Sequence, residues 1–240
     1  MGTKECCAVK ERIGSHKAFQ TMILKELYLY PDLVEYSDNV TDPFRDQSRS
    51  ICNFLERELK PVKFKTSGFK RICFIGKSVA GNKCWVNSSN VLTVEVEFDE
   101  KQYLALAKEE LNPYFITLLK AGLAKCREQF EIPLEHLISS LESFSAGGYV
   151  NKWCFKTKQI KELGIKCALN GQLTTDNFLL TLVVSKSKEV IYDKEILKTV
   201  PDEIVFAPMV KDICLEGDKL TVSDKFGDPT FQLAVNELKV

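Results

Sequence analysis

The amino-acid sequence predicts an α+β protein: N-terminal helices with a small antiparallel sheet, two to three central helices, and a C-terminal antiparallel β-meander. In the first 147 residues, apolar side chains recur at three- and four-residue spacing in several segments, which is the periodicity of a helix with one buried face. After residue 148 the chain changes to short β-rich runs separated by turn residues. The strict strand–helix alternation that builds a parallel sheet is missing from this order.

Each predicted helix has a start or stop signal of its own. Ser15 can cap the first helix and Pro31 ends it. Pro113 occupies the first turn of the strongest helix, and Gly147 follows the last one. The predicted helices cover residues 15–30, 43–59, 112–130 and 133–146, and a shorter helix over 101–111 precedes the third of these.

Two regions predict strands. In the first, residues 92–98 alternate apolar and polar side chains, so one face of that strand is buried and the other exposed. From Tyr149 onward strands and turns are almost continuous, with Asn170-Gly171 as one expected turn. The predicted strands are 62–65, 69–75, 83–86, 91–98, 153–155, 163–169, 178–184, 190–197, 203–206, 213–215, 220–222 and 231–235.

A boundary is expected near Gly147-Gly148, where the element type changes. We expect residues 1–147 to form a helical region with an inserted small sheet. Residues 148–240 are expected to form an antiparallel β region, and the two parts can still share one compact domain.

Charge and cysteine content narrow the function classes. The 33 basic and 33 acidic residues cancel, which disfavours a dedicated nucleic-acid binder, because such proteins neutralise phosphates with clustered Lys and Arg. Nine cysteines without an even framework of short spacings indicate free thiols in a reducing compartment. We therefore expect a cytoplasmic protein, and no apolar stretch reaches the roughly 20 residues of a membrane span.

The chain carries no complete catalytic or metal-binding motif. The segment GKSVAGNK (76–83) has two glycines at the spacing of a phosphate-binding loop, but Asn82 stands where that motif needs Lys, and a strand follows instead of a helix. The histidines His16 and His136 lack sequence partners for nucleophilic or metal chemistry. We expect no catalytic residue, metal or cofactor, and hence a protein that is not an enzyme.

Two charged clusters are candidate binding features. Glu95, Glu97 and Asp99 share one face of a predicted strand and resemble a paired-carboxylate site. The pattern favours an exposed strand face, on which Lys63 and Lys65 of a nearby strand would pair with them. Between residues 60 and 83 the chain holds only basic charges, interleaved with phenylalanines; this basic strip can follow phosphates or meet an acidic partner, or it can be the wet side of strands.

The segments GYVNKW (148–153), ELGI (162–165) and EILKTVPDEIVF (195–206) resemble bacterial toxin-immunity proteins with α+β folds. The resemblance covers the C-terminal 90 residues and implies a cytoplasmic, non-catalytic protein that binds a partner toxin, commonly by covering a nuclease active site. The alternative is a nucleic-acid-binding or nucleic-acid-processing protein that uses the basic strip and the carboxylates. The candidate partner-binding residues are Lys63, Lys65, Lys70, Arg71, Glu95, Glu97 and Asp99.

Overall fold

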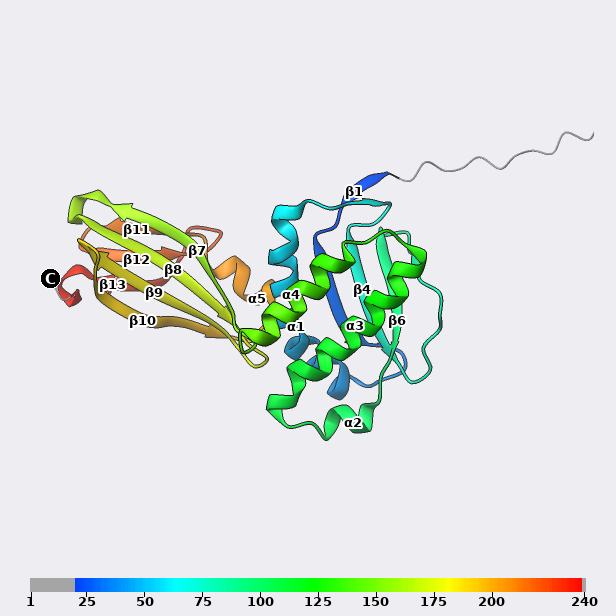
Figure 1. Ribbon diagram of the computed structural model, residues 1–240. Helices are drawn as coiled ribbons and strands as arrows, with labels where there is room; N and C mark the ends of the chain where they lie inside the picture. Colours follow the sequence, from blue (N-terminus) through cyan, green and yellow to red (C-terminus); the bar gives the residue numbers. More distant parts are fainter. Residues whose placement is uncertain (1–19, 239–240) are drawn as a thin grey trace, which may run out of the picture.

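The computed structural model describes residues 20–238, which form two lobes that lie side by side (Figure 1). The first lobe combines helices with a sheet, and its hydrophobic core draws on residues 24–144. The second lobe is built mainly from strands, and its separate core draws on residues 160–238. The predicted α+β class is confirmed.

The first lobe contains a four-stranded mixed sheet in the order β2-β4-β6-β5, in which β2, β4 and β6 run parallel and β5 runs antiparallel to β6. A short antiparallel ribbon, β1 with β3, lies beside it. The elements of this lobe are β1 (Thr21–Ile23), β2 (Glu26–Pro31), α1 (Asp38–Val62), β3 (Lys65–Ser67), β4 (Arg71–Lys77), β5 (Trp85–Val86), β6 (Val91–Glu97), α2 (Glu100–Leu104), the 3-10 turn Lys108–Glu110, α3 (Leu111–Gln129) and α4 (Leu134–Ala146).

The expected antiparallel pairing of this sheet is wrong. The chain crosses from β2 to β4 through α1, and a connection that contains β5 lies between the parallel neighbours β4 and β6. Parallel pairing requires such crossovers. The sequence shows α1, but it does not show that the flanking strands are neighbours.

The first predicted helix is also wrong over its described part, since residues 21–23 and 26–31 are strands. The run ELYLYP at 26–31 fits a two-residue period, and its burial alternates along the strand. The same leucines also fit a helical spacing, and pattern alone did not separate the two. The proposed cap Ser15 lies outside the described residues.

The remaining helices of this lobe are largely as predicted. Helix α1 is longer than expected and contains Pro43 and Pro61, while α3 and α4 agree with their predicted ranges to within one residue at each end. The short helix predicted over 101–111 is instead α2, ending at Leu104, followed by a 3-10 turn. Among the residues that the structure describes, no helix is both long and apolar enough to cross a membrane.

Helices cover one face of the mixed sheet. Leu27, Ile72 and Leu92 stand in register on that face, each with no exposed surface, and belong to the core shared with α1, α3 and α4. Gly122 of α3 lets the helix approach closely, because a Cβ there would lie 2.2 Å from Cδ1 of Phe74.

Helix α1 also covers the free edge of β2. Ser48 Oγ donates to the Leu29 carbonyl at 2.7 Å, Arg49 Nη1 donates to the Leu27 carbonyl at 2.8 Å, and Glu56 Oε1 accepts from the Leu27 N–H at 2.8 Å. Main-chain N–H and C=O groups that are left unpaired at a strand edge can pair with other chains. The side chains of Ser48, Arg49 and Glu56 hydrogen-bond to these groups of β2 and so block such pairing.

The second lobe contains two antiparallel sheets, in the orders β10-β9-β8-β7 and β11-β12-β13, that share one core. Its antiparallel strand architecture is as predicted. Its elements are β7 (Asn151–Ile160), the 3-10 turn Lys161–Leu163, β8 (Ile165–Leu173), β9 (Phe178–Lys186), β10 (Glu189–Thr199), α5 (Glu203–Phe206), the 3-10 turn Ala207–Met209, β11 (Asp212–Glu216), β12 (Lys219–Ser223), β13 (Pro229–Ala234) and the 3-10 turn Val235–Glu237.

Two local predictions in this lobe are wrong. Residues 203–206 form a helix instead of a strand, because Asp202 caps them by accepting the Ile204 N–H at 2.9 Å. Gly171 lies inside β8 and not in a turn. The ring of Phe155 occupies the space that a Cβ of residue 171 would take. The β8–β9 turn lies at 174–177, where Thr174 Oγ1 accepts the Asn177 N–H.

Candidate functional site

Helices α3 and α4 lie over one face of the mixed sheet (Figure 1). The opposite face carries a set of aromatic and apolar side chains. Alternate residues of a strand point to opposite faces, so Tyr28, Cys73 and Thr93 form one row on this face, and Tyr30, Ile75 and Glu95 form the next. None of these residues belongs to the core that contains the helices. We call the surface formed by Tyr28, Tyr30, Arg71, Ile75, Trp85 and Glu95 the open face.

Trp85 is the most exposed aromatic residue of the open face. It pairs with Thr93 across the short strand β5 and keeps 44% of its surface exposed. Tyr30 and Ile75 are half-buried within the same face. Burial raises the pKa of the Tyr30 phenol above its ordinary value, so this side chain is a neutral hydrogen-bonding group at physiological pH.

Two arginine side chains already lie over the aromatic ring of Tyr28. The guanidinium carbons of Arg49 and Arg71 lie 4.6 and 4.7 Å from the centre of its ring, and Arg71 Nη2 lies 2.5 Å from Glu26 Oε2. Arg71 was a candidate partner-binding residue; the structure places it in this ion pair at the amino end of β4. Its charge is therefore compensated within the chain.

Acidic side chains gather at the carboxyl ends of the parallel strands and in the segments that follow them. We call this set the acidic edge; it consists of Asp32, Glu35, Glu95, Glu97, Asp99 and Glu100. Asp32 follows β2 and pairs with Lys77 of β4, Nζ to Oδ2 3.0 Å. Burial raises the pKa of Asp32, but the Val34 N–H and the Lys77 ammonium outweigh it and hold that pKa below its ordinary value. Glu35 accepts the N–H of Ser78 at 3.1 Å. These contacts hold the β2–α1 loop against the loop that follows β4.

Three large apolar side chains project from these two loops into solvent. Leu33 is 65% exposed, Val34 97% and Val79 83%. The hydrogen bond of Glu35 to Ser78 shows that the loops are adjacent. Exposed apolar groups rimmed by charge are typical of interaction sites when they occur together.

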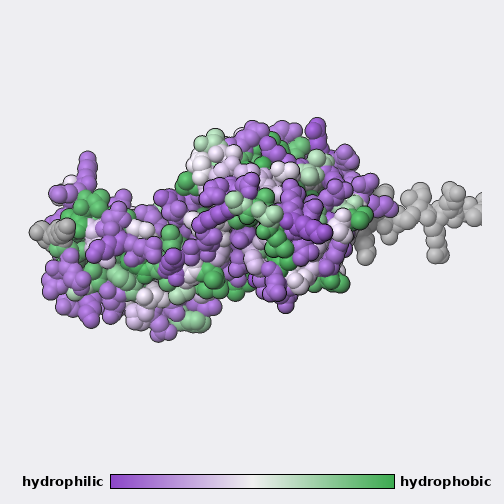
Figure 2. Space-filling model, turned by 90° about the horizontal axis from the view of Figure 1, so that it is seen from below, coloured by the Kyte–Doolittle hydropathy of each residue, from purple (hydrophilic) through white to green (hydrophobic). Residues whose placement is uncertain are grey.

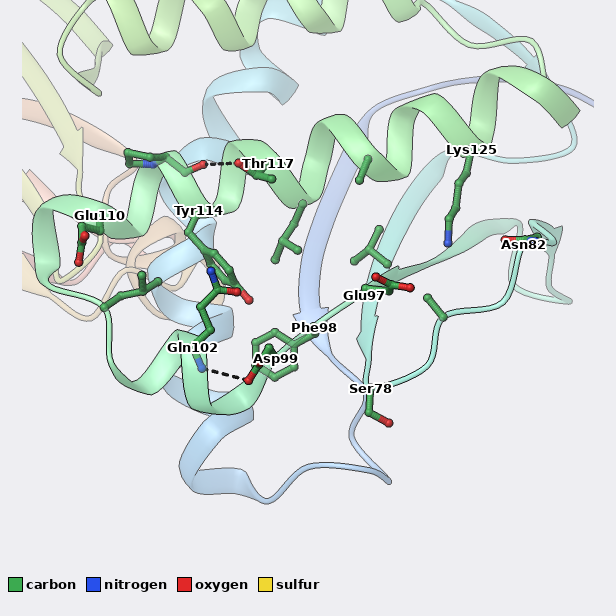
Figure 3. A pocket seen from close by; sticks show the side chains of 16 residues that line it. Ser78, Asn82, Glu97, Phe98, Asp99, Gln102, Glu110, Tyr114, Thr117 and Lys125 are labelled. Atoms are coloured by element: carbon green, nitrogen blue, oxygen red, sulfur yellow. Dashed lines mark hydrogen bonds between the residues drawn. The ribbon is translucent and has the colours of Figure 1, made fainter.

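A cavity of about 770 Å³ opens beside the acidic edge, between β6, α2, α3 and the loop after β4 (Figure 3). Asp99 caps α2 by accepting the Gln102 N–H at 3.0 Å. Lys125 Nζ donates to the main-chain carbonyls of Gly81 and Glu95 at 3.0 and 2.9 Å. Ligands of α/β sheets commonly bind at the carboxyl ends of the parallel strands, which is where this cavity lies.

Two lining groups of the cavity lack a well-placed partner. Within the described part of the chain, the exposed Glu97 carboxylate has no hydrogen-bond or ion-pair partner, and the buried Tyr114 hydroxyl makes no well-formed hydrogen bond, although the Asp99 N–H lies close enough to lower its pKa. Burial raises the pKa of Tyr114 to about 12. A buried hydroxyl without a partner is unfavourable by about 1–3 kcal/mol, so this end of the cavity would gain from a polar ligand group.

The structure does not bring the two predicted charged clusters together. Lys63 caps the carboxyl end of α1 with φ at 50°, Lys65 is the first residue of β3, and Lys70 directly precedes β4. Glu97 and Asp99 lie at the opposite end of the sheet, and the seven residues of β4 span roughly 20 Å. Lys63, Lys65 and Lys70 of the basic strip therefore lie at the other end of the lobe from the carboxylates, whereas Lys77 lies beside them.

The cross-strand pairing expected between Lys65 and the carboxylates is wrong. Strand β3, which carries Lys65, pairs with β1 and not with β6. Glu95 instead accepts the Gly81 N–H at 2.7 Å and braces the loop after β4. Lys77, the last strand residue of the basic strip, pairs with Asp32.

Sequence reasoning missed the aromatic residues of the open face. Tyr30 was assigned to a helix, and Trp85 was placed in a strand without a role. The two-residue alternation of 26–31 was the available signal. Tyr114 and Lys125 come from α3, and no local pattern relates them to the distant strand β6.

Among residues 20–238, no group of three or more His, Cys, Asp or Glu side chains is placed to hold a metal ion. Comparison of the chain with protein-family models, curated proteins and solved structures found no match. The function must therefore be argued from the open face, the acidic edge and the cavity.

Proposed function

We propose that the chain is a non-catalytic protein-binding protein that docks a basic partner protein on the open face and the acidic edge. The observation that carries this proposal is the open face, on which the exposed Trp85 and the half-buried Tyr30 and Ile75 lie beside the carboxylate of Glu95. Tyr and Trp are enriched among the residues that dominate protein interfaces, since they bury large areas with few rotatable bonds.

The negative charge of the acidic edge indicates that the partner is basic. The side chains at the carboxyl ends of the parallel strands and in the loops after them are mostly acidic, and Lys77 among them is already paired with Asp32. Complementary charge speeds encounter and selects partners. The acidic residues concerned are Asp32, Glu35, Glu95, Glu97, Asp99 and Glu100.

A basic partner suits the immunity-type function that the C-terminal resemblance implies. A toxin that cleaves nucleic acid needs a positively charged substrate surface, because phosphate contacts supply most of its affinity. An acidic surface with aromatic anchors can cover such a substrate site. We infer that the partner is a toxin of this kind and that binding blocks it.

Nucleic-acid binding is the rival function. It is favoured by the exposed Lys63, Lys65 and Lys70 at the amino end of the sheet. However, base stacking needs free aromatic faces, and two guanidiniums already lie over Tyr28. The acidic edge would also repel phosphates. Protein binding is therefore the better-supported function.

Co-expression with a toxin encoded beside the gene for this chain tests the proposal. The wild-type chain should restore growth of cells that make the toxin. The double variant Trp85→Ser/Glu97→Lys should not, because it removes an exposed anchor and reverses an unpaired charge.

The matched control is Val190→Ser/Glu189→Lys, which makes the same kinds of change at exposed positions at the start of β10 in the second lobe. This control should protect like the wild type. Loss of protection in both variants, or in neither, contradicts the docking surface, and failure of the wild-type chain to protect contradicts the immunity-type function.

A further inference from the structure

The cavity beside the acidic edge has polar groups at both ends and an apolar wall between them (Figure 3). Lys125 lies toward one end, and Gln102 and Tyr114 lie toward the other. Val96, Leu118 and Ala121 contribute to its lining. With a volume of about 770 Å³ it is within the range of cavities that hold a small ligand or a long side chain.

The net charge of the cavity lining is negative, because it holds the three carboxylates Glu97, Asp99 and Glu110 and one cation, Lys125. Lys125 is already bonded to two main-chain carbonyls, and Glu110 accepts the Ala107 N–H at 2.7 Å. Glu97 has no partner among the described residues, and Asp99 uses Oδ1 for the cap of α2, which leaves Oδ2 free. A cation that entered the cavity could pair with these carboxylates.

The Tyr114 hydroxyl supplies a second, independent observation. Its oxygen is buried, and its one nearby donor in the described chain, the Asp99 N–H, is not placed for a well-formed hydrogen bond; a hydroxyl oxygen can accept from a further N–H donor. An ammonium or guanidinium group between Asp99 and Tyr114 would satisfy it. The methylene stem of such a group would lie along the apolar wall, as the stems of Lys and Arg do at protein surfaces.

The geometry points to this cavity as the receptor for one arginine or lysine side chain of the basic partner. The inference rests on the proposed docking function and adds which group of the partner enters the chain, and where. The carboxylates of Glu97 and Asp99 hold the cationic head, the Tyr114 hydroxyl accepts one of its N–H groups, and Val96 and Leu118 contact its stem.

A titration with short capped peptides tests the inference without the partner. The probe is acetyl-Gly-Gly-Arg-Gly-Gly-amide, and the control probes carry Gln or Glu in place of Arg. Added to the ¹⁵N-labelled protein, the Arg peptide should shift the backbone signals of Glu97, Asp99, Gln102 and Thr117. The Gln and Glu peptides should leave these signals unchanged.

Three variants separate the pocket from its surroundings. Glu97→Gln should weaken Arg-peptide binding about tenfold, since a hydrogen bond to a charged group is worth enough for that factor. Tyr114→Phe removes only the hydroxyl and should weaken binding severalfold. The matched control Glu109→Gln removes one exposed charge of the Lys108–Glu110 turn, which belongs neither to the cavity lining nor to the acidic edge, and should bind as the wild type does.

The outcomes are distinct from those of the co-expression experiment. Equal binding of the Arg and Gln peptides, preference for the Glu peptide, or no binding at all overturns the receptor pocket. If the single variant Trp85→Ser, which leaves the pocket intact, abolishes protection against the toxin in that case, the docking surface stands without the pocket. If the Arg peptide binds as expected but the wild-type chain never protects, the pocket stands and the immunity-type function fails.

Discussion

Arg49 of α1 and Glu203 of α5 form an ion pair between the two lobes, with Nε 2.6 Å from Oε2. The Arg49 side chain keeps only 6% of its surface exposed and also binds Glu56, Nη2 to Oε2 2.5 Å. Asn53 Nδ2 donates to Glu203 at 2.9 Å, and Ser50 Oγ donates to the Leu173 carbonyl at 2.8 Å. One face of α1 therefore joins the lobes through polar contacts.

Removal of Arg49 should strongly destabilise the protein. Arg49→Ala leaves Glu56 and Glu203 without their shared cation, and loss of one partner of a buried ion pair typically costs about 3–5 kcal/mol. Urea unfolding followed by far-UV circular dichroism measures the change. The control Arg45→Ala breaks an exposed pair with Asp42 in the same helix and should cost less than about 1 kcal/mol. Equal effects of the two variants would refute a structural role for the buried cluster.

The stability should depend on pH through Glu56. Burial raises its pKa from 4.5 to about 7, and the charge of Arg49 offsets this only in part, because Glu203 shares that cation. The folded protein then holds a proton that the unfolded chain has lost. The free energy of unfolding should fall, on the order of 2–3 kcal/mol, as pH rises from about 4.5 to about 7, and this contribution should be flat above that window.

The variant Glu56→Gln tests this assignment, since it removes the titrating group but keeps an acceptor for the Leu27 N–H. Urea midpoints measured at half-unit intervals from pH 5 to pH 8 should fall less steeply for the variant than for the wild type. Parallel curves would show that another group causes the dependence.

The close contact of α3 with the sheet should make Gly122 intolerant of a side chain. A Cβ there would lie 2.2 Å from Cδ1 of Phe74, so Gly122→Ala should destabilise by about 1–3 kcal/mol through overpacking, although alanine favours helices. Thermal unfolding measures the effect. Ala124→Val enlarges an exposed side chain two residues away and should cost less than about 1 kcal/mol. A stabilised Gly122→Ala variant would contradict the packing described.

The amino end of the sheet should not bind nucleic acid with useful affinity. Filter binding of single-stranded RNA at increasing salt compares the wild type with the triple variant Lys63→Ala/Lys65→Ala/Lys70→Ala. We expect no measurable retention by either protein at 0.15 M salt, a concentration at which specific binders still hold their sites. Retention by the wild type that falls with salt and is lost in the variant would support the rival function instead.

The elements that sequence reasoning located well are those with local signals. Pro113 marks the start of α3 and Gly147 the end of α4, and both helices have the predicted extents. The ends of α1 were less well predicted because Pro43 and Pro61, which usually mark helix ends, lie inside it. Local signals cannot show when the surrounding structure overrides them.

The candidate site was only partly accessible from the sequence. Glu95 and Glu97 lie on one strand, β6, as predicted, because alternation along one strand is local, whereas Asp99 lies beyond that strand and caps α2. Their separation from Lys63 and Lys65 depends on the parallel register of β4 with β6 and on the pairing of β3 with β1. Tyr30, Ile75 and Glu95 form one row only through that register, and contacts between distant segments leave no local pattern.

The central claim is that the open face and the acidic edge bind a basic partner, and calorimetric titration of the toxin encoded beside the gene tests it most directly. We predict a 1:1 complex that Trp85→Ser/Glu97→Lys weakens at least a hundredfold, as truncation of interface anchors commonly does, while Val190→Ser/Glu189→Lys leaves the affinity unchanged. Unchanged affinity in the first variant, or a complex weakened only by changes in the second lobe, would contradict it.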